Sequence, residues 1–284
     1  MANVTLRLKR RGWGETLRTD AWWIAPLLTV VGLGAFLVWA NYRVFEGDNY
    51  FSGHSPIPAN QATNYLTPFY SPLIFEQPKY ADRPSHHAWF LHKPAWMAWL
   101  PSWVSPAALI LIFPAGFRFT CYYYRGAYYK AFWADPPSCA VGEPRKTYWG
   151  ENSFPLIVQN IHRYFLYVAL AFLFLLAYDV YQGMWFKGTD GQKHFGIGVG
   201  TLVLATNLVL LSGYTCGCHS LRHLVGGFRD EMSKAPTSMK LYNCVTCLNK
   251  RHMIWAWCSL VSVGFSDIYV RQCAIGSWVD LRLL

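Results

Sequence analysis

Cysteine and histidine side chains gather in the second half of the chain, in types and spacings that suit metal chemistry. The string YTCGCHSLRHLVGG holds Cys218, His219 and His223, and the later string LYNCVTCLNKRHM holds a Cys-x-x-Cys pair. His162 lies in QNIHRYF and Cys139 in DPPSCAV. His219 and His223 are four residues apart, so on a helix they share one face. Thiolates and imidazoles bind zinc, haem iron and iron–sulfur clusters. The pattern therefore predicts a metal centre.

The ligand types leave several centres open. Haem requires axial ligands on opposite faces of the ring, and His162 facing His219 or His223 would supply them. An iron–sulfur cluster requires thiolates, or two Cys and two His in the Rieske arrangement. The Cys-x-Cys-His-x-x-x-His string offers both ligand types, whereas haem alone would leave its cysteines without a role. A four-Cys zinc site and purely apolar buried cysteines are the remaining interpretations.

Ionisable residues inside apolar stretches give a second indication of function, because such groups are costly in lipid. Arg118 and Arg163 lie near the Cys/His strings, where they would bind haem propionates, balance the charge of a cluster or donate to a quinone carbonyl. Asp267 also lies late in an apolar stretch. Asp179, at the end of another, is expected to extend to the membrane interface, and His87 is expected to be a polar anchor there.

Composition and apolar runs indicate the elements that position these residues. Of the 284 residues, 53% are hydrophobic and only 14% are charged, against about 25% charged in soluble domains. Five apolar runs are long enough to cross about 30 Å of hydrocarbon as helices. The sequence therefore predicts an all-α integral membrane bundle in one membrane domain, 1–284. Its five spans cover about 21–44, 104–124, 155–181, 195–219 and 253–275, and a long outer loop covers 46–103.

Lysine and arginine residues predict the orientation in a plasma membrane. They are denser before the first span, between the second and third, and between the fourth and fifth, which places those segments in the cytoplasm. The N-terminus is then cytoplasmic and the C-terminus extracytoplasmic, with Lys146 and Lys240 inside and Lys79 outside. The Cys/His strings fall at the cytoplasmic face, where thiols stay reduced. The net charge of +10 reflects these inner loops, and no nucleic-acid-binding motif accompanies it. The basic N-terminal segment has no signal-peptide pattern, so we expect it to be retained.

Several strings together resemble a known family. FRFTCYYYRGAYYKAFWADPPSCAV, QNIHRYFLY, GCHSLRHLVGG and NKRHM are similar to the membrane-anchor, cytochrome-b-like subunit of actinobacterial-type succinate dehydrogenase, a respiratory complex II. The similarity covers roughly residues 117–284. It implies a subunit that does not oxidise succinate itself, and the chain has no dinucleotide-binding fingerprint. The implied partners are a flavoprotein subunit, an iron–sulfur subunit, membrane lipid and a quinone, either menaquinone or ubiquinone.

The resemblance also implies cofactors and site residues. A membrane-embedded Rieske-type [2Fe–2S] cluster is a feature of this branch, whereas related anchors hold haem b. On this sequence the cluster maps best to Cys218, His219 and His223, with His162 and Cys139 as further ligand candidates. Where family members often have a second Cys, this chain has Leu221, so the replacement candidates are Cys139, Cys216, Cys244 and Cys247. Because quinone reduction consumes two protons, the candidate quinone-binding residues are His252, Arg163 and Trp22.

Two other functions fit the same residues. One is a diheme anchor of the fumarate-reductase type. The other is a metal-binding membrane scaffold or transporter without redox turnover. Transporters concentrate charges and broken helices at the midplane. In this chain the ionic residues crowd the inner ends of the spans, which favours an electron-transfer anchor.

Overall fold

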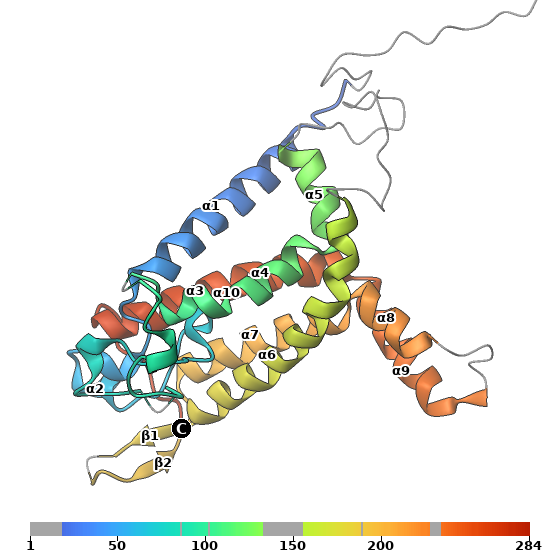
Figure 1. Ribbon diagram of the computed structural model, residues 1–284. Coiled ribbons are helices and arrows are strands. Elements are labelled where there is room, and N and C mark those ends of the chain that lie inside the picture. The colour runs from blue at the N-terminus through green and yellow to red at the C-terminus, as the bar shows by residue number, and fades with distance from the viewer. Residues whose placement is uncertain (1–18, 86, 102, 133–155, 189, 228–233) are drawn as a thin grey trace, which may run out of the picture. The chain divides into compact units, whose positions relative to one another are not determined.

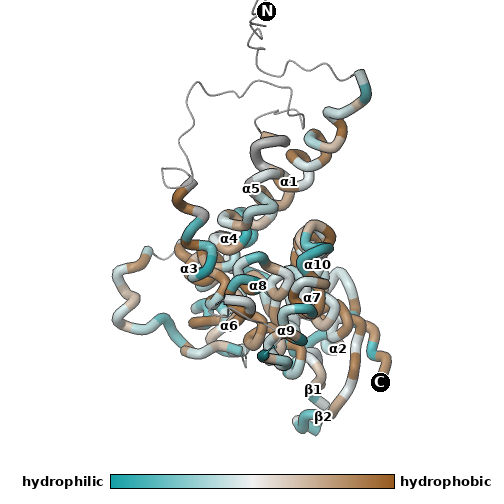
Figure 2. Tube along the Cα trace, turned by 90° about the vertical axis from the view of Figure 1, so that its right-hand side faces the viewer, coloured by the Kyte–Doolittle hydropathy of each residue, from teal (hydrophilic) through white to brown (hydrophobic). Residues whose placement is uncertain are grey.

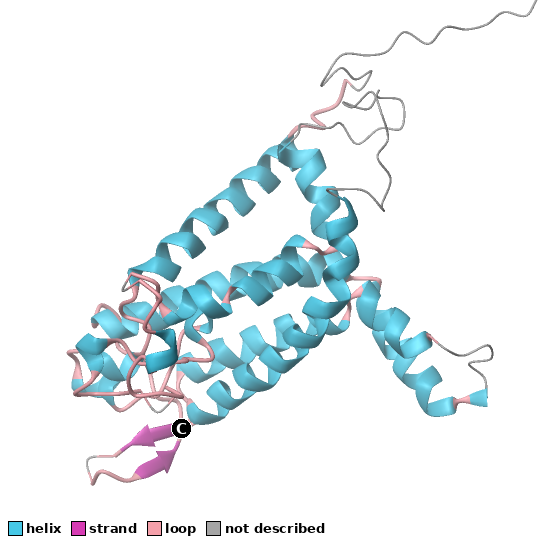
Figure 3. Ribbon diagram, viewed as in Figure 1, coloured by secondary structure: helices cyan, strands magenta, loops and turns pink. Residues whose placement is uncertain are grey.

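The computed structural model describes residues 19–85, 87–101, 103–132, 156–188, 190–227 and 234–284. The chain divides into two compact units, one of residues 1–37 with 119–161 and one of 38–118 with 162–284. Each unit is described by itself. Most described residues are helical, and the described residues form one two-stranded sheet (Figure 3).

The elements follow one another as helices interrupted by short 3-10 turns and a single hairpin (Figure 1). The α-helices are α1 Ile24–Glu46, α2 Pro58–Gln61, α3 Pro106–Ile110, α4 Ile112–Phe119, α5 Tyr122–Phe132, α6 His162–Gln182, α7 Val199–Cys216, α8 His219–Gly226, α9 Pro236–Asn249 and α10 His252–Ile275. The 3-10 helices are η1 Ser52–His54, η2 Pro68–Tyr70, η3 Pro78–Tyr80, η4 Ala95–Met97 and η5 Leu156–Ile161. The strands are β1 Trp185–Lys187 and β2 Lys193–Phe195, paired antiparallel.

Four of these helices are long and apolar enough to cross a membrane: α1, α6, α7 and α10. They coincide with four of the five predicted spans and differ from them mainly at the ends, where helices fray into turns. Figure 2 shows hydrophobic stretches in the long helices and a hydrophilic tip on the hairpin. The chain is thus mostly helical and membrane-embedded, as predicted.

The predicted span 104–124 is not one continuous helix, so the count of five spans is not confirmed. α3 ends at Ile110, and α4 begins again at Ile112. Pro114 is the physical cause, because its ring has no N–H to donate to the carbonyl of Ile110, four residues earlier, and crowds that carbonyl. The chain then turns at Thr120 and Cys121 before α5.

Helices α6, α7 and α10 form the core of the larger unit, with α7 packed against both of the others. Residues at the start of α6 and α10 meet the end of α7, and we call this the histidine end of the bundle (Figure 1). The opposite end, where residues 47–105 fold over the helices, is the loop end. From the histidine end, α8 and α9 continue side by side, in a segment that the sequence predicted only as an inner loop.

Close approach between α7 and α10 depends on a glycine. A Cβ built at Gly213 would lie 2.5 Å from the ring of Trp255. In real structures Cβ atoms do not come this close, so the glycine is what lets the indole lie against the backbone of α7. The same contact holds Tyr214, the next residue, at the face of α10.

We expect Gly213→Ala to lower stability although alanine is the better helix former. The propensity gain is about 1 kcal/mol, whereas overpacking a filled interface costs about 1–3 kcal/mol. The matched control is Gly34→Ala in α1, where a new Cβ would meet nothing within 4 Å. Thermal unfolding of the purified protein measures both. Equal unfolding midpoints for the two variants would contradict the packing argument.

The loop end is held by buried polar residues. Arg271 of α10 is fully buried and donates to Asp267 Oδ1 at 2.9 Å and to Glu46 Oε2 at 2.9 Å. Glu76, also buried, accepts from Tyr50 Oη and from the backbone N of Ser85 at 2.7 Å. The long loop predicted over 46–103 is therefore folded, and it forms a cap on the bundle.

Asp179 and His87 do not lie at the membrane–water interface, contrary to the sequence prediction, because the cap covers them. Both side chains are buried, and His87 Nδ1 lies 2.9 Å from Asp179 Oδ1. The cap supplies a partner for the carboxylate, so it does not extend to water. The pair ties the loop end to the last turn of α6.

The hairpin and the C-terminal residues close the same end. Asp280 accepts from the backbone N of Gly200 at 2.8 Å and from the hydroxyls of Tyr65 and Tyr269. Tyr65 belongs to an apolar core cluster with Val180, Phe186, Leu204 and Val270. The C-terminal segment thereby fixes the start of α7 against α6 and α10.

Candidate functional site

The histidine end brings together two side chains that are far apart in sequence. His162, the first residue of α6, and Cys218, which precedes α8, are both buried, and His162 Nε2 lies 3.0 Å from Cys218 Sγ. Cys218 Sγ also accepts from the backbone N of Ser220 at 3.3 Å, as the N-cap of α8. This pair is the nucleus of the candidate site.

Local sequence explains why Cys218 reaches α6. α7 ends at Cys216, and Gly217 makes the turn into α8. A Cβ at Gly217 would lie 2.7 Å from the carbonyl oxygen of Gly213 and 3.2 Å from the backbone of Leu248. The Cys-Gly-Cys spacing therefore places one cysteine at the last turn of α7 and the other on the next helix.

A row of rings extends from this pair across the bundle. Phe117 of α4 stacks on His162 with centroids 4.6 Å apart, and Tyr214 of α7 meets Phe117 edge-on at 5.4 Å. Tyr214 in turn stacks on His252 of α10 at 5.0 Å. The rings fix the orientation of both imidazoles and line the space between them with apolar surface.

Arg118 lies beside this row and is bound to α10. Its guanidinium donates to the carbonyl of Ala256 at 3.2 Å and to Ser259 Oγ at 2.9 Å. It also lies over the ring of Tyr214 at 4.6 Å, a cation–π contact. The sequence predicted an intramembrane role for Arg118, and the structure places its charge beside Tyr214 and within the first two turns of α10.

His219 and His223 share one face of α8, as their spacing predicted. Their Nε2 atoms are 3.0 Å apart, and both side chains are exposed. Partial burial lowers the pKa of His219, and the nearby charges of His223 and Arg222 lower it further. A neutral imidazole is the form that binds a metal.

The remaining predicted site residues are placed differently. His252 is half-buried in the ring row, and Arg163 is exposed on the first turn of α6. Trp22 is half-buried in the other unit. Cys139 lies outside the described residues. Cys244 and Cys247 are exposed on α9.

Phe117 and Tyr214 were not predicted as part of the site. No local signal distinguishes Phe117 from the other aromatic residues of apolar spans. Tyr214 could have been found by its position, four residues before Cys218 in the chain. The presence of Phe117 in the site depends on how α4 packs against α6 and α7, which the sequence does not show.

A family profile described as actinobacterial succinate dehydrogenase subunit SdhC matches residues 24–276. The chain belongs to this family. Among solved structures it is similar to a chain of the "Mycobacterium smegmatis Sdh1 complex in the apo form", with 40% sequence identity and a TM-score of 0.81. That match covers 99% of this chain and 98% of the other. No curated protein gave a significant match.

As a member of the SdhC family, the chain is a membrane-anchor subunit of actinobacterial succinate dehydrogenase. The resemblance inferred from the sequence strings is therefore confirmed. The enzyme is the complex, and other Sdh subunits are the partners of this chain.

The donor types at the histidine end fit a metal centre with mixed sulfur and nitrogen ligands. Cys218 offers a buried thiol in contact with the imidazole of His162, and His219 with His223 offers a second imidazole pair directly after it in the chain. Among the described residues, no group of three or more His, Cys, Asp or Glu side chains is arranged to hold a metal ion. To bind one metal centre, the His219/His223 pair would have to move toward the His162/Cys218 pair. Otherwise another residue, such as Cys139, would have to supply a further ligand.

Proposed function

We propose that this SdhC chain transfers electrons from a soluble iron–sulfur subunit, itself supplied by a flavoprotein subunit, to a membrane quinone. The buried contact between His162 and Cys218 carries the proposal, because two metal-binding side chains from separate helices meet at the end of the bundle. A Rieske-type [2Fe–2S] centre, once bound there, would supply one-electron transfer at a higher potential than an all-cysteine cluster. The ligand candidates are His162, Cys139, Cys218, His219 and His223.

Residues around the pair have their own roles in this function. Phe117 covers the ring of His162 and excludes water from it. The side chain of Arg118 is fixed by its hydrogen bonds to α10. Its positive charge would stabilise the negative charge that a quinone oxygen gains on reduction. The imidazole of His252, one ring further along, would hold a proton for the same oxygen. Arg163 and Trp22 remain further candidates for contact with the quinone.

The orientation of the chain belongs to the same proposal. The histidine end faces the cytoplasm, so that soluble subunits dock on α8 and α9. Basic residues concentrated there support this orientation by the positive-inside rule: Arg222, Lys234, Lys240, Lys250 and Arg251. The N-terminus is then cytoplasmic and the C-terminus extracytoplasmic.

Arg118→Gln in the assembled complex tests the quinone role. We expect succinate-to-quinone activity to fall about 10- to 100-fold, the effect of losing about 1.5–3 kcal/mol from a charged hydrogen bond. Succinate oxidation by a dye that takes electrons from the soluble subunits should be unchanged. Steady-state assays with both acceptors measure this difference.

The matched control is Arg282→Gln. Arg282 also lies over an aromatic ring, that of Phe186 at 5.0 Å, and also donates to a backbone carbonyl, that of Phe195 at 3.2 Å, but at the loop end of the bundle. We expect it to retain quinone reduction. An unchanged rate in Arg118→Gln, or a loss confined to Arg163→Gln, would show that Arg118 does not contact the quinone.

A further inference from the structure

Four tryptophans of the loop end, between residues 89 and 103, are strongly exposed, and we call them the aromatic face. Trp89, Trp96, Trp99 and Trp103 each expose between 60% and 78% of their surface. The chain carries no acidic residue from Arg83 to Ala134, whereas Arg83 and Lys93 lie within or next to the aromatic segment. Large exposed aromatic surfaces mark interaction sites. Tryptophan in particular is enriched where protein meets the headgroup region of a bilayer.

Contacts within the larger unit show where Trp103 lies along the length of the candidate membrane helices. The ring of Trp103 lies 5.9 Å from that of Phe45, in the last turn of α1. The next residue, Glu46, binds Arg271 near the end of α10. Trp103 therefore lies at the level where two of the candidate membrane helices end.

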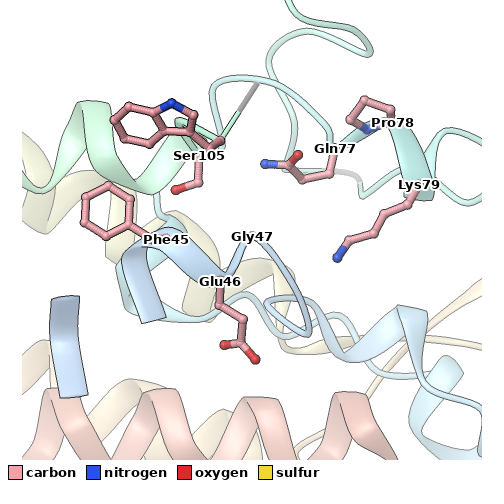
Figure 4. A pocket seen from close by; sticks show the side chains of 8 residues that line it. Phe45, Glu46, Gly47, Gln77, Pro78, Lys79 and Ser105 are labelled. Atoms are coloured by element: carbon pink, nitrogen blue, oxygen red, sulfur yellow. The ribbon is translucent and has the colours of Figure 1, made fainter. Parts of the chain in front are cut away.

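A pocket of about 320 Å³ opens at this level (Figure 4). Phe45 lines one side, and Gln77, Pro78 and Lys79 line the other. Trp103 also lines the pocket, with its ring 5.9 Å from that of Phe45. The carboxylate of Glu46 is directed toward α10 and bound by Arg271 of α10 and by Arg43 of α1. Lys79 Nζ pairs with Asp48 at 2.9 Å, and both side chains are partly exposed, so this ion pair is weak and open to exchange. The pocket thus combines apolar rings with a cation and an amide.

We propose that the loop end binds a phospholipid of the adjacent leaflet. The phosphate lies beside Lys79 and Gln77, and an acyl chain follows the rings of Phe45 and Trp103. The volume suits a phosphate and glycerol group rather than a whole lipid, whose chains remain in the bilayer. A phosphate diester is anionic, and lysine binds it as a point charge. The aromatic face then rests in the same headgroup layer. The proposal does not depend on the electron-transfer role.

Photocrosslinking in native membranes identifies what covers the aromatic face. The photoreactive amino acid p-benzoylphenylalanine is placed at position 99 in the assembled complex. We expect an adduct with the mass of one phospholipid. Position 174, where Phe174 is 79% exposed midway along α6, is the lipid-facing control, and position 192, on the exposed hairpin tip, is the water-facing control. An adduct with another polypeptide at position 99, or a yield as low as that of position 192, would overturn the proposal.

Retention of lipid tests the pocket itself. The complex is stripped in detergent and titrated with phosphatidylglycerol, and bound lipid is counted by native mass spectrometry. We expect Lys79→Ala to weaken binding about tenfold, the loss of one charged contact. Lys187→Ala, which removes an exposed lysine at the end of strand β1, should bind as the parent does. Diacylglycerol, which lacks the phosphate, should bind about equally to the parent and to Lys79→Ala. Unchanged binding in Lys79→Ala, or displacement of the lipid by inorganic phosphate alone, would contradict a phospholipid site.

Discussion

Replacing His162 by Ala together with Cys218 by Ser is expected to abolish succinate-to-quinone electron transfer. Loss of residues that merely orient a metal ligand costs about 10- to 100-fold in activity, so loss of two ligands should exceed 100-fold. Oxidation of succinate by a dye reduced at the soluble subunits should persist, because in the proposed function those subunits carry their own redox centres. Iron, labile sulfide and the absorption spectrum are measured in the same preparations.

Matched variants separate loss of the centre from loss of the fold. Cys258→Ser removes an exposed thiol from α10, and His194→Ala removes an exposed imidazole from the hairpin. Both should leave quinone reduction unchanged.

Replacing both His219 and His223 by Ala should also abolish quinone reduction, since we expect at least one of the two to be a metal ligand. Normal quinone reduction in the His162/Cys218 variant would remove that pair from the electron path. Loss of a haem band with unchanged sulfide would identify the centre as haem b.

The sequence alone predicted the long helices, because each is an uninterrupted apolar run that must satisfy its own backbone in lipid. α6 and α10 begin at His162 and His252, within seven residues of the predicted starts at 155 and 253. The prediction of a single helix for the second span was wrong, because Pro114 interrupts the helix although the segment is hydrophobic. α8 and α9 were missed because short polar helices give no such signal and depend on packing against each other.

The candidate site could be predicted only where its geometry depends on local sequence. The shared face of His219 and His223 follows from their spacing of four, which is a local property. Contact between His162 and Cys218 joins positions 56 residues apart, and it depends on the turn at Gly217. The stacking of Phe117 on His162 requires the register of α4 against α6, which no periodicity encodes.

The second large effect concerns the buried arginine of the loop end. Arg271→Met is expected to destabilise the protein by about 3–5 kcal/mol, because it leaves the buried carboxylate of Asp267 without its ionic partner. Arg271 Nε donates to both oxygens of Asp267, whose Oδ2 also accepts from Trp39 Nε1 at 3.1 Å, and Nη1 donates to Glu46. Thermal inactivation of the complex and the yield of the assembled protein report the loss. Arg282→Met, which removes an exposed arginine near the C-terminus, should change stability by less than about 0.5 kcal/mol.

A double-variant cycle shows whether the cost arises from the unpaired charge. Asp267→Leu alone leaves Arg271 buried with less compensation, whereas Asp267→Leu with Arg271→Met replaces the pair by apolar side chains. Apolar replacement of a buried ion pair is often neutral or stabilising, so the double variant should be more stable than Arg271→Met alone. Glu46 still binds Arg43 at 2.6 Å in that variant, so its charge remains compensated. Losses in the two single variants that simply add in the double variant would instead mean that each side chain contributes through its own packing and not through the ion pair.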